Sequence, residues 1–312
     1  MSSRTRTYRL SVLALLASLA GASSALAATS AEVLDASKPS DWRQPDATKL
    51  LYMELAAGRV IIELNPVFAP AAVANIKALA AKGYYDGLSI IRVQDNYVTQ
   101  WGDPKADTDE ARKEVLADKS VPAEYAKVWD KALSFTPLPD GDVYAAEVGY
   151  IGGFPVARDA QHKEVWLTHC YGMVGVARGT EPDSGSGSQL YVVIGHSPRQ
   201  LDRNITLAGR VLQGMEYLSA LPRGHGTLGF YEEDQTMPTI RSVRIAAELP
   251  AAARTPLEVL RTDTETFDRY VESRRSRDLG WFVESTDRIE VCNVGTPVRL
   301  VPIQSSPEPE AR

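Results

Sequence analysis

The sequence predicts a mainly β protein, built as a β-barrel capped by two helices. Short runs rich in β-branched and aromatic residues recur along the chain, separated by glycine- and proline-containing turns. Helical periodicity is clear at two places among these runs. No internal repeat is visible. Many short strands with two helices are typical of a closed β architecture.

The strand patterns begin with a hairpin, in which the runs 51–55 and 60–64 flank a turn at Gly58. Pro70 then stands where a helix can start, and apolar residues on one face continue to Ala81 before Gly83 ends the pattern. Further strands are predicted at 88–93, 172–177, 189–194, 205–211 and 240–245, with a second short helix over 215–221.

Four other segments are less regular. We expect a polar linker over 28–48 and a long insertion over about 105–165, whose charged, proline-rich and glycine-rich stretches show no clear element except one short helix near 109–116. After the main domain (49–247), an α/β extension (248–304) is predicted to hold short amphipathic helices at 257–260 and 267–271 and a strand at 289–292. Residues 305–312 are expected to be disordered.

The N-terminus resembles a cleavable secretory signal. Arg4, Arg6 and Arg9 precede an apolar run over 10–20 and small residues ending at Ala27. Cleavage after residue 27 would leave 285 of the 312 residues, exported to the periplasm. An uncleaved membrane anchor is the alternative, but the apolar run is short and no second span follows it. Once the signal is cleaved, we expect no stable membrane insertion of the mature chain.

The charge of the chain excludes some partners. Removing the three signal arginines takes the formal net charge from −6 to −9, and no basic block is present to bind phosphates. Nucleic acid and anionic bilayers are therefore poor partners. The chain has two cysteines, Cys170 and Cys292. In an oxidising compartment they form either a disulfide or two buried free thiols, and the sequence leaves both open. The four histidines lack the spacing of metal ligands, so no metal site is predicted.

A single arginine, Arg92, stands among apolar neighbours in the strand pattern 88–93. Such a cation either reaches water or faces a group that interacts with it, because burying it alone is too costly. Gln100 and Gln189, together with nearby aromatic residues, indicate a site that binds amide groups. The alternatives are a structural ion pair for the arginine and glutamines that satisfy backbone groups at a barrel edge.

Five blocks of sequence, in the right order, resemble the cyclophilin family. The segment Phe68-Ala69-Pro70-Ala71-Ala72-Val73-Ala74-Asn75-Ile76 with Gly83-Tyr84-Tyr85-Asp86-Gly87 is similar to the family's "aPktvaNF…GyYdG" signature. The other four blocks are Ile91-Arg92-Val93 through Gln100 and Gly102-Asp103, Val121 to Tyr125, Val176-Ala177-Arg178 with Ser184 to Tyr191, and Leu201-Asp202 to Gly209-Arg210-Val211. The resemblance covers roughly 49–247.

The resemblance implies peptidyl-prolyl cis-trans isomerase activity on an eight-stranded antiparallel barrel closed by two helices, with proline-containing polypeptides as partners and no cofactor or metal. By position, Arg92 and Gln100 are the catalytic residues, the arginine stabilising a twisted Xaa–Pro bond. The residues that would bind substrate are Tyr97, Val98, Arg178, Gln189, Tyr191 and Leu201. Without the alignment, the apolar ones among them would be taken for core.

The chain departs from the family pattern in the cleft. Ile91 replaces a histidine, Trp101 replaces a glycine and Leu190-Tyr191 replaces a pair of phenylalanines. Gln200 stands where the cyclosporin-contacting tryptophan would lie, and Ile205 replaces the pocket histidine. We therefore expect weak cyclosporin binding. Two hypotheses follow: an active periplasmic isomerase, or a cyclophilin-fold peptide-binding or chaperone module that has lost useful turnover.

One further motif, Gly224 to Gly229, satisfies a dinucleotide-binding pattern. It follows a helix and Pro222 where the motif requires a strand. We interpret it as a flexible turn.

Overall fold

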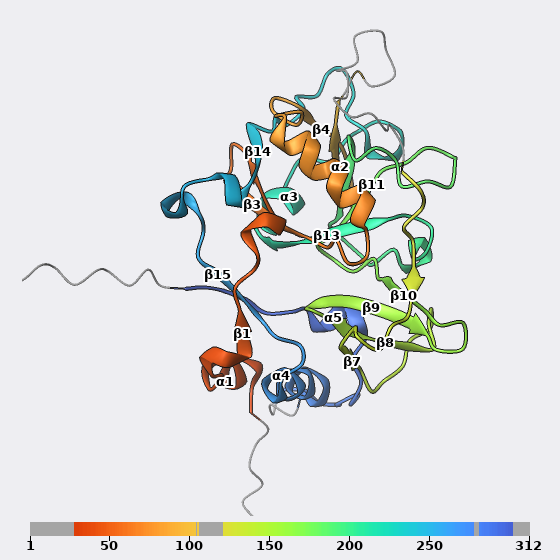
Figure 1. Cartoon of the computed structure of the whole chain (residues 1–312), viewed down its shortest axis with the longest axis vertical. Helices are drawn as coiled ribbons and strands as arrows, with labels where there is room; N and C mark the ends of the chain where they lie inside the picture. Colours follow the sequence, from red (N-terminus) through yellow and green to blue (C-terminus); the bar gives the residue numbers. More distant parts are fainter. Residues whose placement is uncertain (1–27, 104, 106–120, 278–280, 302–312) are drawn as a thin grey trace, which may run out of the picture.

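The computed structural model describes residues 28–103, 105, 121–277 and 281–301 (Figure 1). The predicted signal (1–27), the predicted helix near 109–116 and the predicted disordered tail (305–312) lie outside these residues. Within them, no helix has the length and apolar character needed to cross a bilayer.

An eight-stranded antiparallel sheet forms the larger part of the molecule, as predicted. Its strands, in spatial order, are β14 (Ser242–Ile245), β2 (Leu50–Glu54), β3 (Arg59–Leu64), β13 (Leu207–Gln213), β11 (Met173–Val176), β12 (Leu190–Val193), β5 (Val98–Gly102) and β4 (Ser89–Gln94). The sheet curls until its two edges approach each other. The backbone of Ile240, just before β14, exchanges hydrogen bonds of 2.8 Å with Gly87 and Leu88, just before β4.

Two helices cap this barrel, α2 (Pro70–Ala81) and α3 (Met215–Ser219). Pro70 occupies the first turn of α2, where its missing N–H is not needed. The N–H groups of Ala71 and Ala72 donate to the carboxylate of Glu124, both at 2.9 Å, which satisfies free donors at the positive end of the helix. The buried face of α2 belongs to the barrel core with Trp101.

The insertion contains a second, five-stranded sheet, which corrects the prediction that 105–165 lacks clear elements. Its order is β6 (Lys127–Val128), β10 (Glu164–Leu167), β9 (Phe154–Asp159), β8 (Glu147–Ile151) and β7 (Phe135–Pro137). Gly152 and Gly153, both at positive φ, form the turn between β8 and β9. The strands are short and carry proline and glycine, so the sequence pattern alone reads as loop.

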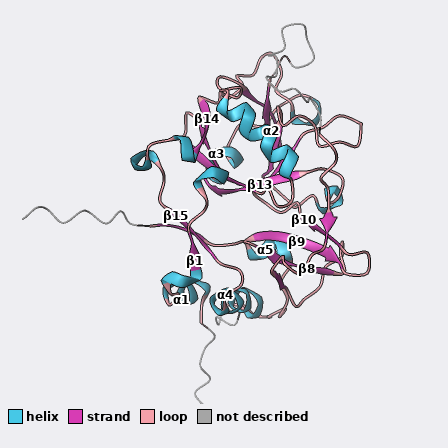
Figure 2. Cartoon of the chain, viewed as in Figure 1, coloured by secondary structure: helices cyan, strands magenta, loops and turns pink. Residues whose placement is uncertain are grey.

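The described N-terminal and C-terminal segments pack beside the insertion sheet. The N-terminal segment, predicted as a linker, holds α1 (Ser30–Asp35) and β1 (Trp42–Arg43). The C-terminal extension holds β15 (Leu257–Leu260), α4 (Glu265–Ser276), α5 (Val291–Val294) and β16 (Val298–Leu300). Strands β1, β15 and β16 form a three-stranded sheet. Figure 2 shows α1, β1, α4 and α5 below the barrel in the view of Figure 1.

The structure confirms the helix predicted at 267–271 but not two other elements of the extension. The predicted helix at 257–260 is strand β15, and the predicted strand at 289–292 gives way to helix α5. Four-residue segments carry too little periodicity to distinguish the two states. Partner strands on both sides decide the first case, and the Glu290 carboxylate, which accepts from the N–H of Cys292 at 3.1 Å, caps the second. Within the described ranges, 3-10 turns lie at Pro39–Asp41, Ala47–Lys49, Arg199–Leu201, Thr227–Gly229, Ala246–Glu248 and Ala251–Ala253.

A second hydrophobic core lies between the barrel and these added segments. It combines Val33 of α1, Tyr150 and Val156 of the insertion sheet and Phe267 of α4 with Met173 of the barrel. A disulfide between Cys170 and Cys292 crosses the same region and ties the C-terminal extension to the main body. Of the two alternatives for the cysteines, the structure therefore has the bridge.

Candidate active site

Three neighbouring strands place the predicted catalytic residues together. Arg92 on β4 lies opposite Gln100 on β5, and Gln100 lies opposite Tyr191 on β12. The pairing of β4 with β5 shifts register between Ile90 and Arg92. Opposed residues of paired strands point to the same face of the sheet, so these three side chains share one face.

The guanidinium of Arg92 is held on several sides. Its Nε donates to the carbonyl of Leu228 at 2.7 Å, one Nη donates to Oε1 of Gln100 at 3.2 Å, and the other donates to Oε1 of Gln94. These bonds use three of the five N–H donors of an arginine. Burial lowers the pKa of Arg92 from its ordinary value, although Tyr97 opposes the shift. An arginine nevertheless stays charged at neutral pH.

The two glutamines form a chain behind the arginine. Nε2 of Gln100 donates to Oε1 of Gln189 at 3.1 Å, so the amide of Gln100 is oriented from both ends. Gln189 does not line the cavity described below, since its side chain packs against Gly102. The contact of Gln189 that the structure shows is this hydrogen bond to Gln100, and its contact with substrate stays a prediction.

A cavity of about 280 Å³ opens beside Arg92. The residues lining it are Arg92, Tyr97, Val98, Gln100, Ala177, Arg178, Tyr191, Leu201, Ile205, Leu228 and Phe230. Most of these side chains are apolar, and the guanidinium groups of Arg92 and Arg178 and the amide of Gln100 lie among them. An apolar hollow with few polar groups is the usual form of a small-molecule or side-chain site.

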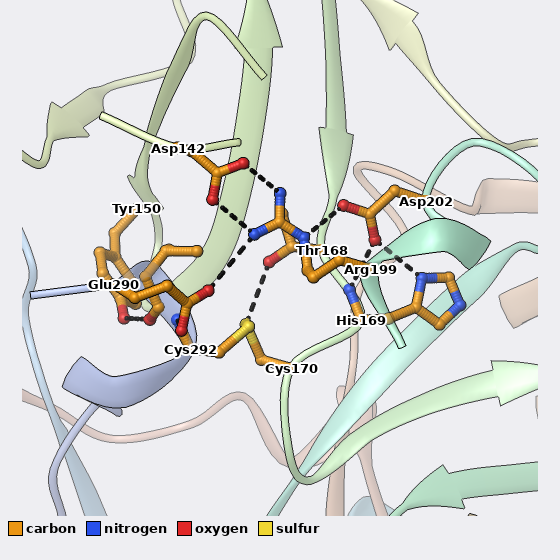
Figure 3. Close-up of a disulfide and its surroundings, with 10 residues drawn as sticks. Asp142, Tyr150, Thr168, His169, Cys170, Arg199, Asp202, Glu290 and Cys292 are labelled. Atoms are coloured by element: carbon orange, nitrogen blue, oxygen red, sulfur yellow. Dashed lines mark hydrogen bonds and ion pairs between the residues drawn. A yellow bond between two sulfur atoms is a disulfide. The ribbon is translucent and has the colours of Figure 1, made fainter. Parts of the chain in front are cut away.

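Tyr191 buries its hydroxyl in a chain of polar side chains that leads away from the cavity. The hydroxyl lies 2.9 Å from Nε2 of His169, and Nδ1 of His169 lies 3.0 Å from Oδ1 of Asp202. Arg199 bonds the other oxygen of Asp202 at 2.6 Å and reaches Asp142 with both Nη atoms, at 2.8 and 3.0 Å (Figure 3). Burial raises the pKa of the Tyr191 hydroxyl above its ordinary value, so it stays protonated.

A family model described as cyclophilin type peptidyl-prolyl cis-trans isomerase/CLD matches residues 50–247. The chain belongs to this family and is an isomerase of this class. The match takes in all eight strands of the barrel and every residue that lines the cavity beside Arg92.

This cyclophilin is similar to other proteins of the family and to a solved crystal structure. A probable peptidyl-prolyl cis-trans isomerase from Brucella suis is 28% identical over 201 residues, which cover 64% of this chain and 85% of that protein. The human peptidyl-prolyl cis-trans isomerase-like 1 is 33% identical over 66 residues, or 21% of this chain and 37% of that protein. The crystal structure of cyclophilin AquaCyp293 from Hirschia baltica matches with a TM-score of 0.68 at 27% identity and covers 88% of this chain and 98% of that one.

The predicted site residues of this cyclophilin fall into two groups. Arg92, Gln100, Tyr97, Val98, Tyr191 and Leu201 all line the cavity. Arg178 also lines it, but its N–H groups donate to the carbonyls of Asn204 and of the loop that follows it, including Glu181 at 3.0 Å. These bonds hold the loop after Arg178, and the substrate contact of Arg178 stays a prediction. Gln200, at the position of the family tryptophan, is exposed and does not line the cavity.

The sequence missed two parts of this site. The glycine-rich segment interpreted as a flexible turn packs on β4, where Gly229 comes so close that a Cβ there would lie 2.6 Å from Cα of Gln94. This contact places Leu228 and Phe230 at the cavity beside Arg92. His169, one of the four histidines without metal-ligand spacing, is fully buried and lies against Tyr191. Neither role leaves a local signal, because both depend on segments far apart in the chain.

Proposed function

We propose that this cyclophilin accelerates rotation about Xaa–Pro bonds in exported proteins, and that Arg92 lowers the barrier by stabilising the twisted amide. The observation that carries the proposal is the arginine at an apolar cavity with two N–H donors left over. Three of its five donors bind Leu228, Gln100 and Gln94, and the remaining two have no hydrogen-bond partner among the residues that the structure describes.

The chemistry follows from the electronic structure of the amide. Rotation meets a barrier near ~20 kcal/mol because the nitrogen lone pair is delocalised into the carbonyl. Twisting the bond returns that lone pair to the prolyl nitrogen. A guanidinium N–H aimed at this nitrogen therefore meets a better acceptor in the transition state than in either planar isomer, which is the condition for catalysis.

The cavity can position the prolyl ring of a substrate next to Arg92. Val98, Tyr191, Leu201 and Ile205 offer an apolar wall for the prolyl ring. The amide of Gln100, with both ends oriented by Arg92 and Gln189, keeps one N–H and one lone pair for the peptide backbone beside the proline. A bound ring would thus lie with its nitrogen on the side of the guanidinium.

Arg92→Ala tests this mechanism. In a protease-coupled assay on an Xaa–Pro tetrapeptide, we expect kcat/KM to fall about 100-fold or more, the usual effect of removing one transition-state donor. Arg59→Ala is the matched control, because Arg59 is a half-buried barrel arginine paired with Glu54 outside the cavity. Little turnover by the unmodified chain, with peptide binding unchanged in Arg92→Ala, would instead support the binding or chaperone module.

Export and weak cyclosporin binding belong to the same proposal. The signal-like pattern over 1–27 and the Cys170–Cys292 disulfide both favour the periplasm, where disulfides persist. Mass spectrometry of the periplasmic fraction is expected to find a chain of 285 residues, and an uncleaved chain in the membrane fraction would contradict this. The exposed Gln200 supports the weak binding of cyclosporin, and strong inhibition at low cyclosporin concentration would count against it.

A further inference from the structure

Tyr191 forms part of the cavity wall, and residues outside the cavity hold its side chain in place. We infer that four buried side chains, His169, Asp202, Arg199 and Asp142, position Tyr191 for binding the prolyl ring. We call these four residues the relay. The inference rests on the proposed function, because it concerns the same cavity.

The relay determines where the Tyr191 hydroxyl points. The Asp202 carboxylate accepts from the backbone N–H of His169 at 2.9 Å and from its ring Nδ1 at 3.0 Å. In the tautomer that carries the ring proton on Nδ1, towards Asp202, Nε2 is an acceptor. The hydroxyl oxygen of Tyr191 lies 2.9 Å from Nε2 and donates its proton to it in that tautomer. The two rings lie nearly parallel, with 11° between their planes. The O–H is thereby used on His169, and an aromatic face is left for the ligand.

Glycine makes room for this arrangement. A Cβ at Gly175, opposite Tyr191 on the neighbouring strand, would lie 2.2 Å from Cζ of the tyrosine and 2.3 Å from its oxygen. The tyrosine ring therefore lies directly over the β11 backbone, with its hydroxyl against His169. The ring has no free space on that side in which to move.

Arg199 connects this pair to the insertion. Its side chain is 3% exposed, and it bridges two buried carboxylates, Asp202 (7%) and Asp142 (2%). Its other acidic contact, Glu290 of the C-terminal extension, is 43% exposed and lies at 3.5 Å. Asp142 is therefore the main partner on the far side of the guanidinium. Neither the insertion nor the extension lines the cavity, and Arg199 is one of the links between these segments and the cavity wall formed by Tyr191.

Removing Asp142 is expected to weaken substrate binding and to leave the chemical step intact. Without its bidentate partner, the buried guanidinium must find another acceptor, and its bond to Asp202 changes with it. His169 then loses its fixed orientation, and the Tyr191 hydroxyl forms a hydrogen bond with water in the cavity instead. A hydrated cavity wall binds the apolar prolyl ring less tightly. Arg92 and Gln100 keep their contacts, so the chemical step is unaffected. KM should rise and kcat should not change.

Asp142→Ala and Asp140→Ala form a matched pair for the test. Asp140 lies two residues away on the same loop and pairs with Arg275 at 2.8 Å, but it does not contact the relay. In the protease-coupled assay, we expect Asp142→Ala to raise KM roughly fivefold to tenfold with kcat within about twofold, and Asp140→Ala to change neither by more than about twofold. The same changes are then made in a Tyr191→Phe background, where no hydroxyl remains to be positioned. There Asp142→Ala should have no more effect than Asp140→Ala.

The test has outcomes that overturn the inference. Equal effects of Asp142→Ala in the Tyr191 and Tyr191→Phe backgrounds would show a general structural role, and so would a loss confined to kcat. If Asp142→Ala does not fold by circular dichroism, Asp142→Asn and His169→Gln are compared in the same two backgrounds with the same criteria. If the unmodified chain shows no turnover, the proposed function fails, and the coupling is measured instead as the Kd of an Ala-Pro tetrapeptide by calorimetry. Turnover that depends on Arg92, without coupling between Asp142 and Tyr191, refutes the relay alone.

Discussion

Glu63→Gln is expected to be among the most destabilising single changes in the barrel. Glu63 on β3 is 4% exposed and lies opposite Arg210 on β13, which is 7% exposed. The carboxylate accepts from Arg43 at 2.7 Å and from Arg210 at 3.2 Å. Breaking a buried pair leaves an uncompensated charge, which costs about 3–5 kcal/mol. We expect the free energy of unfolding to fall by that amount.

The first hairpin also provides the control. Glu54 pairs with Arg59 at 2.6 Å, but the two side chains are 33% and 31% exposed. Exposed pairs contribute about 0.2–1 kcal/mol, so Glu54→Gln should lower the free energy of unfolding by no more than that. The measurement is urea unfolding of both variants at pH 7, followed by circular dichroism. Equal losses in the two variants would refute the reasoning from burial.

The Glu63 carboxylate should also make the free energy of unfolding depend on pH. Burial opposes ionisation of Glu63 and is the largest single influence, but Arg210 and Arg43 together outweigh it and hold the pKa of Glu63 below its ordinary value. A lowered folded-state pKa means that the stabilisation is complete above the ordinary pKa of a glutamate, about 4.3, and is lost as the pH falls towards the folded value. Unfolding measured from pH 7 down to pH 3 should therefore show a shallower acid limb in Glu63→Gln.

Two other predictions concern the disulfide and the loop over Arg92. Reducing Cys170–Cys292, which are 122 residues apart, should lower the free energy of unfolding by about 5 kcal/mol in the chain-entropy model; urea unfolding with and without reductant measures this, and a loss under 1 kcal/mol would contradict it. Gly229→Ala places a Cβ at a φ of +80°, 2.6 Å from Cα of Gln94, and should displace the Leu228 carbonyl from Arg92. We expect kcat/KM to fall about tenfold in the isomerase assay, and an unchanged value would show that this carbonyl does not help to hold the guanidinium.

The barrel was predictable because its information is local. Seven of the eight strands correspond to predicted short runs of β-branched and apolar residues bounded by turn residues, and Pro70 with an apolar face predicts α2. Strand β5 (Val98–Gly102) is not among the strands predicted from the pattern, and only the family resemblance implies it. The added segments were not predictable in this way. Strand β15 and helix α5 are four residues long, and such segments adopt the conformation that their neighbours impose.

The sequence by itself determined most strands of the barrel and its two capping helices through short-range periodicity. The ordered motifs that resemble the cyclophilin family predicted the eight-stranded barrel and site residues such as Arg92 and Gln100. Only the tertiary structure decided what surrounds them. It places the Leu228 carbonyl where it accepts a hydrogen bond from Arg92, and it places Gln189 where it accepts a hydrogen bond from Gln100. It also joined Tyr191 to Asp142 through three buried side chains. Hydrogen bonds between residues so far apart in the chain depend on how the segments fold together, and no local pattern records them.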